Sequence, residues 1–442
     1  MKAGAPPGRR AAETASTLAG GEDLALALDR DDPLAVLRAE FAIPPWPGGR
    51  YPELAYFAGN SLGLMPLAAR EAVEEELEHW AQLALDGHFG GPRPWVPYQE
   101  LMRETSARLV GARVGETVCM NTLTVNLHLL MATFYRPTAE RFRIVIEDAA
   151  FPSDSYAVAS QAVHHGVDPS RAIVRLRPRE GEDTLRTEDV VAFLEREGAS
   201  VALVLLGAVN YLTGQLMDLP EITAAARAAG AVAGWDLAHA AGNVPLSLHD
   251  WDVDWAAWCS YKYLNGGPGA VGGAFIHERH ARDVSLPRLA GWWGNDLAGR
   301  FRMQPEFVPR PDVESWQVSN PPILSLAPVR VSLELFDRVG MTALRERSLR
   351  LTGYLEKLLD DAAGEIAAEV VTPRDPSARG CQLSLRVPSG AKELAARLRA
   401  EEGVVCDERE PNIVRLAPVP LYSSFHDVWR AVEGLRRLAT AS

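Results

Sequence analysis

The sequence predicts an α/β fold in which a large domain is followed by a small α+β domain. Short apolar runs alternate with helical patterns as far as residue 320, which is typical of a sheet covered by helices. After Pro321 and Pro322 the pattern changes to long helices followed by short strands that look antiparallel. The chain has 442 residues, of which 47% are hydrophobic, so its length allows two or three domains and a core that can enclose a site.

The elements of the large domain follow from hydrophobic periodicity. Apolar residues at helical spacing predict helices over residues 66–85 and 123–134. Short apolar runs bounded by polar residues predict strands, and these cover residues 141–147, 201–206, 231–236, 255–261 and 271–277. Further helices are expected between some of these strands, over residues 187–197 and 221–229.

The same patterns describe the small domain. Helices are predicted over residues 325–336, 342–359 and 392–400, and an antiparallel set of strands over residues 381–387, 404–406 and 413–416. We place the hinge near Asn320, which gives a large domain over residues 56–320 and a small domain over residues 321–442. Residues 1–20 are rich in Ala, Gly, Pro and Thr and lack an apolar signal segment, so a disordered extension is expected there.

Charge and cysteine content exclude several classes of partner. The net charge of −13 argues against binding to nucleic acid or to an anionic membrane surface, because phosphate neutralisation needs a basic face. No run of 18 apolar residues exists, so no membrane span is expected. The four cysteines are scattered without metal-ligand spacing, so no metal site is predicted and a reduced cytoplasmic compartment fits best. They are Cys119, Cys259, Cys381 and Cys406.

Two strand-like runs end in residues that suggest a cofactor. Asp236 closes the run over residues 231–236, and Lys262 closes the next one 26 residues later. A lysine can carry pyridoxal phosphate (PLP) as a Schiff base, and an aspartate can keep its pyridine nitrogen protonated. Taken alone, these residues fit equally well a surface lysine at the end of a strand and an aspartate that caps a helix.

Further motifs resolve this ambiguity through a family resemblance. They are the segments 60–64, 123–128, 151–154, 211–215, 235–244, 249–251, 259–265, 291–292, 319–322 and 415–422. In this order and spacing, from about Tyr56 to about His426, the chain resembles kynureninase. The resemblance implies PLP-dependent transferase fold type I, with a mostly parallel seven-stranded sheet in the large domain and residues 21–55 packed on the small domain. It also implies a homodimer whose active site lies near the subunit interface.

The implied reaction is the hydrolytic cleavage of the Cβ–Cγ bond of kynurenine or 3-hydroxykynurenine. The products would be anthranilate, or its 3-hydroxy form, and L-alanine, in tryptophan catabolism or NAD synthesis. The expected catalytic residues are Lys262, Tyr261 and Asp236. The resemblance implies a cofactor site formed by Leu123, Thr124, Phe151, Pro152, Ser153, Asp154, Asp236, His239, Tyr261, Lys262, Trp292 and Asn320. It implies a substrate site formed by Arg415, His88, Ser319 and Asn320.

One position departs from the family pattern. Relatives often carry a small hydroxyl residue about six positions before the Thr213-Gly214-Gln215 motif, whereas this chain has Gly207. One side-chain hydrogen bond near the cofactor is therefore expected to be missing, at a cost of about 1 kcal/mol unless backbone or water replaces it.

Two other functions compete with this assignment. A PLP lyase of the cysteine-desulfurase type would need a reactive thiol on an exposed loop, whereas Cys381 falls on the apolar side of a predicted strand. A non-catalytic module with the same fold would typically lose the lysine or gain a basic nucleic-acid-binding domain, and neither feature is present.

Overall fold

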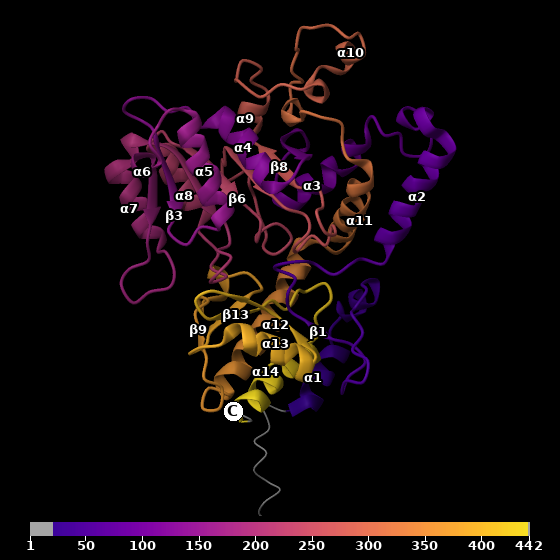
Figure 1. Ribbon diagram of the computed structural model, residues 1–442, viewed down its shortest axis with the longest axis vertical. Coiled ribbons are helices and arrows are strands. Elements are labelled where there is room, and N and C mark those ends of the chain that lie inside the picture. Colours follow the sequence, from indigo (N-terminus) through magenta and orange to yellow (C-terminus); the bar gives the residue numbers. More distant parts are fainter. Residues whose placement is uncertain (1–20, 441–442) are drawn as a thin grey trace, which may run out of the picture.

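A seven-stranded sheet with helices on both faces forms the larger of two units in the computed structural model, which describes residues 21–440 (Figure 1). The smaller unit lies below it and is built around a four-stranded sheet, with the indigo N-terminal helix beside the yellow C-terminal one. Residues 1–20, for which a disordered extension is predicted, lie outside the described residues.

The large sheet has the strand order β2-β8-β7-β6-β5-β3-β4. Strands β3 to β7 pair in parallel, and β8 runs antiparallel to both of its neighbours, so the prediction of a mostly parallel seven-stranded sheet is confirmed. The strands are β2 (Thr117–Cys119), β3 (Arg143–Glu147), β4 (Ile173–Leu176), β5 (Val201–Gly207), β6 (Val232–Asp236), β7 (Trp255–Trp258) and β8 (Gly273–Ile276). The strand predicted over residues 255–261 is shorter than expected, because β7 ends at Trp258.

Alternating side chains bury both faces of this sheet. On β3, Ile144 and Ile146 pack into the core on one face, whereas Val145 packs into the core on the other. Helices α4 (Leu123–Phe134) and α5 (Pro152–His164) cover the first face, and α7 (Thr187–Glu197) and α8 (Leu219–Ala228) cover the second. Because the strands are buried on both sides, they appear in the sequence as continuous apolar runs.

Two tryptophans occupy the second core close to the carboxyl ends of the central strands. Trp235 on β6 and Trp258 on β7 are each 1% exposed. The indole N–H of Trp235 donates to Thr223 Oγ1 on α8 at 3.0 Å, which satisfies its only polar atom. Both rings therefore lie directly beneath the polar residues that follow these strands.

The smaller unit contains an antiparallel sheet with the order β12-β13-β10-β9. Its strands are β9 (Glu369–Val370), β10 (Leu383–Arg386), β12 (Asp407–Arg409) and β13 (Ile413–Leu416). The antiparallel set is as predicted for β10 and β13, but the prediction for residues 404–406 was wrong. Strand β11 (Val404–Val405) pairs in parallel with β1 (Ala55–Tyr56), outside that sheet. The N-terminal segment supplies its partner strand, a long-range pairing that local periodicity does not reveal.

Helix packing shows where the chain passes between the units. Helix α11 (Ile323–Val339) packs against α2 (Ala68–Leu83) and α3 (Arg103–Val110) of the larger unit. In the smaller unit, α12 (Met341–Asp361), α13 (Ala391–Glu402) and α1 (Gly21–Arg30) all pack against α14 (Phe425–Thr440). Contacts therefore change from one unit to the other near Gly340, and the domain limits at residues 55 and 320 stay predictions.

Short helices complete the chain. They are α6 (Pro169–Ala172), α9 (Glu278–Ala281), α10 (Leu297–Arg300) and the 3-10 segments Ala35–Glu40, Ala84–His88, Tyr98–Met102, Val114–Glu116, Gly198–Ser200, Trp292–Gly294, Val313–Trp316 and Pro376–Ala378. Within residues 21–440, no helix combines the length and apolar character that a membrane crossing needs.

Candidate active site

A pocket of about 150 Å³ opens where the parallel strands of the large sheet end. In open α/β sheets ligands gather at this carboxyl edge, because the loops that follow the strands diverge there. The residues that line the pocket are Thr122, Leu123, Thr124, Glu147, Phe151, Ser153, Asp154, Gly207, Val209, Tyr211, Asp236, Ala238, His239, Tyr261 and Lys262. The structure thus brings together most of the cofactor residues predicted from the sequence.

Lys262 lies in the loop that follows β7, with its amine in the pocket. Its Nζ lies 3.1 Å from Nε2 of His239, a buried residue whose Nδ1 has no hydrogen-bond partner. Burial, together with the nearby charge of Lys262, lowers the pKa of His239 well below its usual value, so the imidazole is neutral. Gly63 donates its backbone N–H to Tyr261 O and packs so closely that a Cβ there would lie 2.3 Å from Lys262 O. A glycine is therefore required beside the lysine loop.

Three buried carboxyl groups face the same pocket. Asp236 ends β6 and accepts a hydrogen bond from the backbone N–H of Ala238 at 2.6 Å. Asp154 lies in the first turn of α5, and Glu147 ends β3. Burial raises the pKa of all three carboxyl groups, and for Glu147 it does so to about 7. Such a set is unfavourable without a cation, so it fits a ligand that brings a protonated nitrogen.

The N-termini of α4 and α5 meet at the pocket. Leu123 and Thr124 begin α4, where backbone N–H groups have no acceptor within the helix. The hydroxyl groups of Thr124 and Ser153 lie 2.7 Å apart and join the two first turns. This arrangement of donors and helix dipoles fits a phosphate group. Thr122 occupies the N-cap position, but its side chain makes no capping hydrogen bond.

Aromatic side chains form the walls between these groups. The Lys262 amine lies 5.9 Å from the ring centre of Phe151 and 5.8 Å from that of Tyr261. Phe151 meets the ring of Tyr211 edge to face at 5.3 Å. Pro152 is the first residue of α5, where its fixed φ favours the start of a helix. A flat ring therefore fits between the helix termini and the acidic residues.

Arg415 reaches this region from β13 of the smaller unit and is completely buried. Its Nε donates to Asp407 Oδ1 at 2.7 Å, and its Nη1 donates to the carbonyl of Tyr211, a residue of the pocket, at 2.6 Å. Nη2 lies 3.1 Å from Ser61 Oγ. Although burial opposes ionisation, the Arg415 guanidinium keeps the pKa of Asp407 below its usual value. The guanidinium is therefore held in one orientation beside the pocket.

Six predicted site residues lie outside the pocket lining: Pro152 and Arg415, described above, and four others. Trp292 is 41% exposed and donates its indole N–H to Arg300 O, and Ser319 and Asn320 are exposed. His88 is half-buried against the ring of Trp95 at 5.4 Å. Within this single chain they do not meet Lys262, and their roles stay predictions.

Comparison with known proteins identifies the family. A kynureninase from Salinispora tropica is 63% identical to this chain, over 94% of the chain and 96% of the relative. The chain belongs to the kynureninase family. Kynureninases from Koribacter versatilis and Myxococcus xanthus are 55% and 56% identical, over 93% and 94% of this chain and 96% of each relative. The family model described as the kynureninase C-terminal domain matches residues 344–435.

Solved structures outside the kynureninase family confirm the predicted fold. A cysteine desulfurase from Thermococcus onnurineus NA1 matches with a TM-score of 0.72 at 18% identity, over 88% of this chain and 95% of that chain. A C-DES variant with glycine covalently linked to its PLP cofactor matches with a TM-score of 0.70 at 17% identity, over 88% of this chain and 96% of that chain. The chain is thus a kynureninase of PLP-dependent fold type I, and its cofactor is PLP.

The cysteines do not support the desulfurase alternative. Cys381 is completely buried, and burial raises the pKa of its thiol to about 12. Burial also raises the pKa of Cys406 to about 12, and Cys119 and Cys259 are buried. All four cysteines lie in the described part of the chain, and none presents an exposed thiol of lowered pKa.

Sequence reasoning missed three residues that shape the site. Glu147 directly follows an apolar strand, which is the same signal that revealed Asp236. Tyr211 begins the family motif over residues 211–215, but the sequence alone indicates no role for its ring. Asp407, the partner of Arg415, lies in the short strand β12 and gave no signal, because only the pairing of β12 with β13 places it there.

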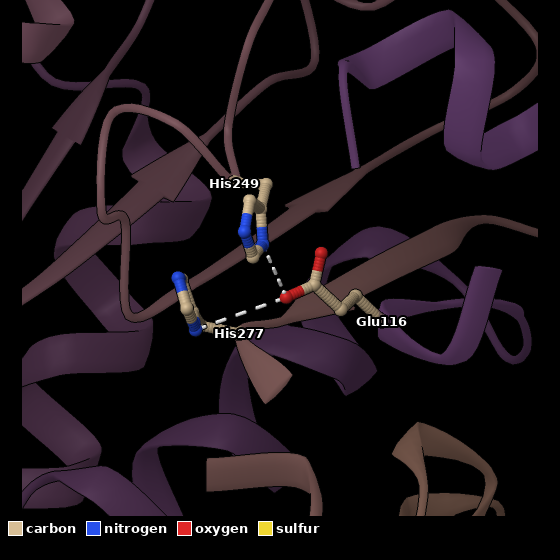
Figure 2. Close-up of side chains that lie close together, drawn as sticks. All are labelled: Glu116, His249 and His277. Carbon is tan, nitrogen blue, oxygen red and sulfur yellow. Dashed lines mark hydrogen bonds and ion pairs between the residues drawn. The ribbon is translucent and has the colours of Figure 1, made fainter. Parts of the chain in front are cut away.

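A second cluster lies at the opposite edge of the sheet (Figure 2). Glu116 Oε1 accepts from His249 Nδ1 at 2.8 Å and from the backbone N–H of Glu278 at 2.7 Å, and His277 Nδ1 lies 3.7 Å away. The second oxygen accepts from the backbone N–H of Arg113 at 2.7 Å. The carboxylate therefore joins three segments of chain that meet at this edge, residues 113–116, His249 and residues 277–278.

Proposed function

We propose that this kynureninase holds PLP between Lys262, Asp236 and the N-termini of α4 and α5. The single observation that carries the proposal is the pocket itself, in which an amine, buried carboxyl groups and two helix N-termini face one space. When bound, PLP supplies an electron sink for negative charge that develops next to the substrate amine. Leu123, Thr124 and Ser153 would hold its phosphate, and Asp236 its protonated ring nitrogen.

Lys262 is assigned two tasks. Its Nζ would hold the cofactor covalently, and as a free amine it would move the proton at the substrate Cα. His239 lies within hydrogen-bond distance of this amine and is neutral, so it orients the amine without adding a second positive charge.

Arg415 is assigned to the α-carboxylate of the substrate. A guanidinium binds a carboxylate through two parallel hydrogen bonds, and Asp407 already fixes its plane. The arginine is completely buried in the structure, so the substrate carboxylate would replace one of its present partners, such as the carbonyl of Tyr211.

Tyr261 is assigned as a proton donor. Burial raises the pKa of its phenol, so the hydroxyl stays protonated at neutral pH. In the reaction, water adds to the γ-carbonyl carbon of kynurenine and the Cβ–Cγ bond breaks. The electron pair of this bond stays on Cβ, and the carboxyl group formed at Cγ leaves as part of anthranilate. Cβ then takes a proton, which gives L-alanine.

We assign the remaining site residues to a homodimer. Phe89 and Trp292 pack edge to face around Phe301 at 5.6 and 5.4 Å, and all three are at least 41% exposed. Exposed apolar groups of this size commonly mark a subunit interface. In a dimer with the site at the interface, Trp292, His88, Ser319 and Asn320 would complete the partner's pocket. A cytoplasmic enzyme of tryptophan catabolism or NAD synthesis is the corresponding cellular role.

The activity is tested by incubating the purified protein and PLP with kynurenine. We expect the fluorescence of anthranilate to appear together with an equal amount of L-alanine. Alanine without anthranilate, or no product of either kind, would overturn the assignment. Sedimentation of the same preparation tests the dimer, which Phe301→Asp should weaken.

Substrate choice is tested with both kynurenines on two proteins. A site that hydrogen-bonds a substrate hydroxyl rejects the analogue without it, so the wild type should favour 3-hydroxykynurenine in kcat/KM. His88→Trp combined with Asn320→Thr should move the preference towards kynurenine. An unchanged ratio at saturating PLP would remove both residues from hydroxyl recognition.

A further inference from the structure

Three neighbouring strands end in a row at the carboxyl edge of the sheet. They are β3, β5 and β6, and they end at Glu147, Gly207 and Asp236. Gly207 is paired with Asp236, and β5 lies between the other two strands. Because the middle residue has no side chain, the outer two carboxyl groups lie on either side of an open position.

The Glu147 carboxyl group extends over this open position. A Cβ added at Gly207 would lie 3.1 Å from Glu147 Oε1. Glu147 is 5% exposed, and its Oε2 has no hydrogen-bond partner. An acidic oxygen that is buried, unpaired and directed into a pocket needs a ligand or a proton to offset its desolvation.

The electrostatic surroundings of Glu147 are mixed in sign. On its pocket side it shares the lining with Asp154, Asp236, Tyr211 and Lys262. On its other side a cavity of about 70 Å³ is lined by Asp148, Asp183, Asn210 and Arg386 among others. Burial raises the pKa of Glu147 to about 7, and the charge of Asp236 adds to this increase. A hydrogen bond from Asn210 lowers the pKa and so partly opposes both effects. The group therefore changes charge within the ordinary working range of pH.

We propose that Glu147 is a positioning residue that acts through Asp236, and that its ionised carboxylate strengthens the hold of Asp236 on the protonated ring nitrogen of the cofactor. A second negative charge beside Asp236, across the position of Gly207, favours a cation in the pocket. The protonated Glu147 lacks this charge and contributes only its shape. This inference rests on the proposed role of Asp236.

The test compares PLP affinity of the wild type and Glu147→Gln across pH. Glutamine has the shape of the protonated acid, so both proteins should bind PLP equally at about pH 5.5. At about pH 8.5 the wild type should bind PLP about tenfold more tightly. Titration of Lys262, of His239 and of the cofactor is common to both proteins, so it cancels in the ratio of the wild-type PLP affinity to that of Glu147→Gln. A ratio that is constant with pH would overturn the proposal, because a structural defect acts at every pH.

Gly207→Ser supplies a second, independent variant. Its hydroxyl would lie within reach of the Glu147 carboxylate and could donate to it, at the cost of a small side-chain shift. Because a donor stabilises the ionised form, the pH at which PLP affinity rises should fall relative to the wild type. If Glu147→Gln does not fold, this shift decides the question, and an unchanged midpoint contradicts the proposal.

Asp236→Asn separates this inference from the proposed function. If Asp236 holds the ring nitrogen, this variant should lose PLP affinity at every pH. If it binds PLP as the wild type does, the role of Asp236 is wrong. If Asp236→Asn loses affinity while the ratio of PLP affinities between the wild type and Glu147→Gln does not change with pH, only the role of Glu147 is wrong.

Discussion

At the scale of single residues, the site depends on charges that the fold removes from water. Lys262 lies beside His239 and Arg415 donates to Asp407, whereas Asp236 accepts from the backbone of Ala238, two residues further along the chain. Removing one member of such a set leaves a buried group unpaired, which costs more than the interaction itself contributes. Substitutions of these residues therefore change the rate of the reaction or the affinity for the substrate, and the two effects can be measured separately.

Lys262→Ala should abolish turnover, because the chain loses both the amine that holds the cofactor and the group assigned to move the Cα proton. We expect kcat to fall by at least about a thousandfold, since proton transfer alone commonly contributes up to about ten thousandfold. Anthranilate fluorescence measures the rate, and the melting temperature of the apo form serves as the folding control. Turnover within tenfold of wild type would assign the proton transfer to another residue.

Arg415→Lys should raise KM more than it lowers kcat, because lysine keeps the charge but loses the two-pronged geometry. A charge-assisted pair is worth roughly 1.5–3 kcal/mol, which corresponds to a KM increase of about 10- to 150-fold. Arg409→Lys is the matched control, since Arg409 also contacts Asp407 at 3.2 Å but is partly exposed. Equal effects of the two substitutions would place the carboxylate site elsewhere.

At the scale of elements, strand and helix ends do most of the positioning. The sheet presents Asp236 and Glu147, the first turns of α4 and α5 present Thr124 and Ser153, and β13 presents Arg415. The opposite edge of the same sheet is fixed by the Glu116 carboxylate, which accepts hydrogen bonds from His249 (Figure 2) and from the backbone N–H groups of Arg113 and Glu278. The edge with Glu116 therefore affects stability, whereas the edge with Lys262 affects catalysis.

Glu116→Ala should destabilise the fold while sparing the pocket. The backbone N–H groups of Arg113 and Glu278 and the His249 ring would lose their acceptor, at a cost of about 2–4 kcal/mol in the free energy of unfolding. Urea unfolding measures this loss. Glu140→Ala, an exposed site with the same change of charge, should stay within about 0.5 kcal/mol of wild type. Equal stability of the two variants would contradict a structural role for Glu116.

At the scale of the whole molecule, the buried acids make stability depend on pH. The folded chain keeps the proton of Glu147 up to a pKa of about 7, whereas an ordinary glutamate loses it near 4.5. Folding therefore binds a proton between these two values. The stabilisation from this group is complete below pH 4.5 and is lost as the pH rises to about 7.

Apo Glu147→Gln should lack this pH dependence. Relative to the variant, the apo wild type should lose about 3 kcal/mol of unfolding free energy between pH 4.5 and pH 7. Urea unfolding of both apo proteins at a series of pH values measures the difference. Parallel curves would show that Glu147 is ionised throughout this range.

The sequence predicted features that depend on neighbouring residues better than features that depend on pairing between strands. Helix α4 and strand β6 follow from periodicity. The resemblance implied a cofactor site with Lys262, Asp236, His239 and Phe151, and these four residues line one pocket. The long-range pairing of β11 with β1 was missed, and so was the nearby pairing of Asp407 with Arg415, because the short strand β12 gave no periodic signal. Trp292 and Asn320 belong to a surface that a single chain leaves open, so their roles depend on the proposed second subunit.

The two tryptophans beneath the pocket give the molecule an optical property. Trp235 directly precedes Asp236, and Trp258 ends the strand that leads to Lys262. Both indoles are shielded from water, so their emission should be blue-shifted compared with that of exposed tryptophans. A chromophore attached to Lys262 would lie close enough to accept their excitation energy. Loss of indole fluorescence should therefore report the arrival of the cofactor in real time, without any substrate.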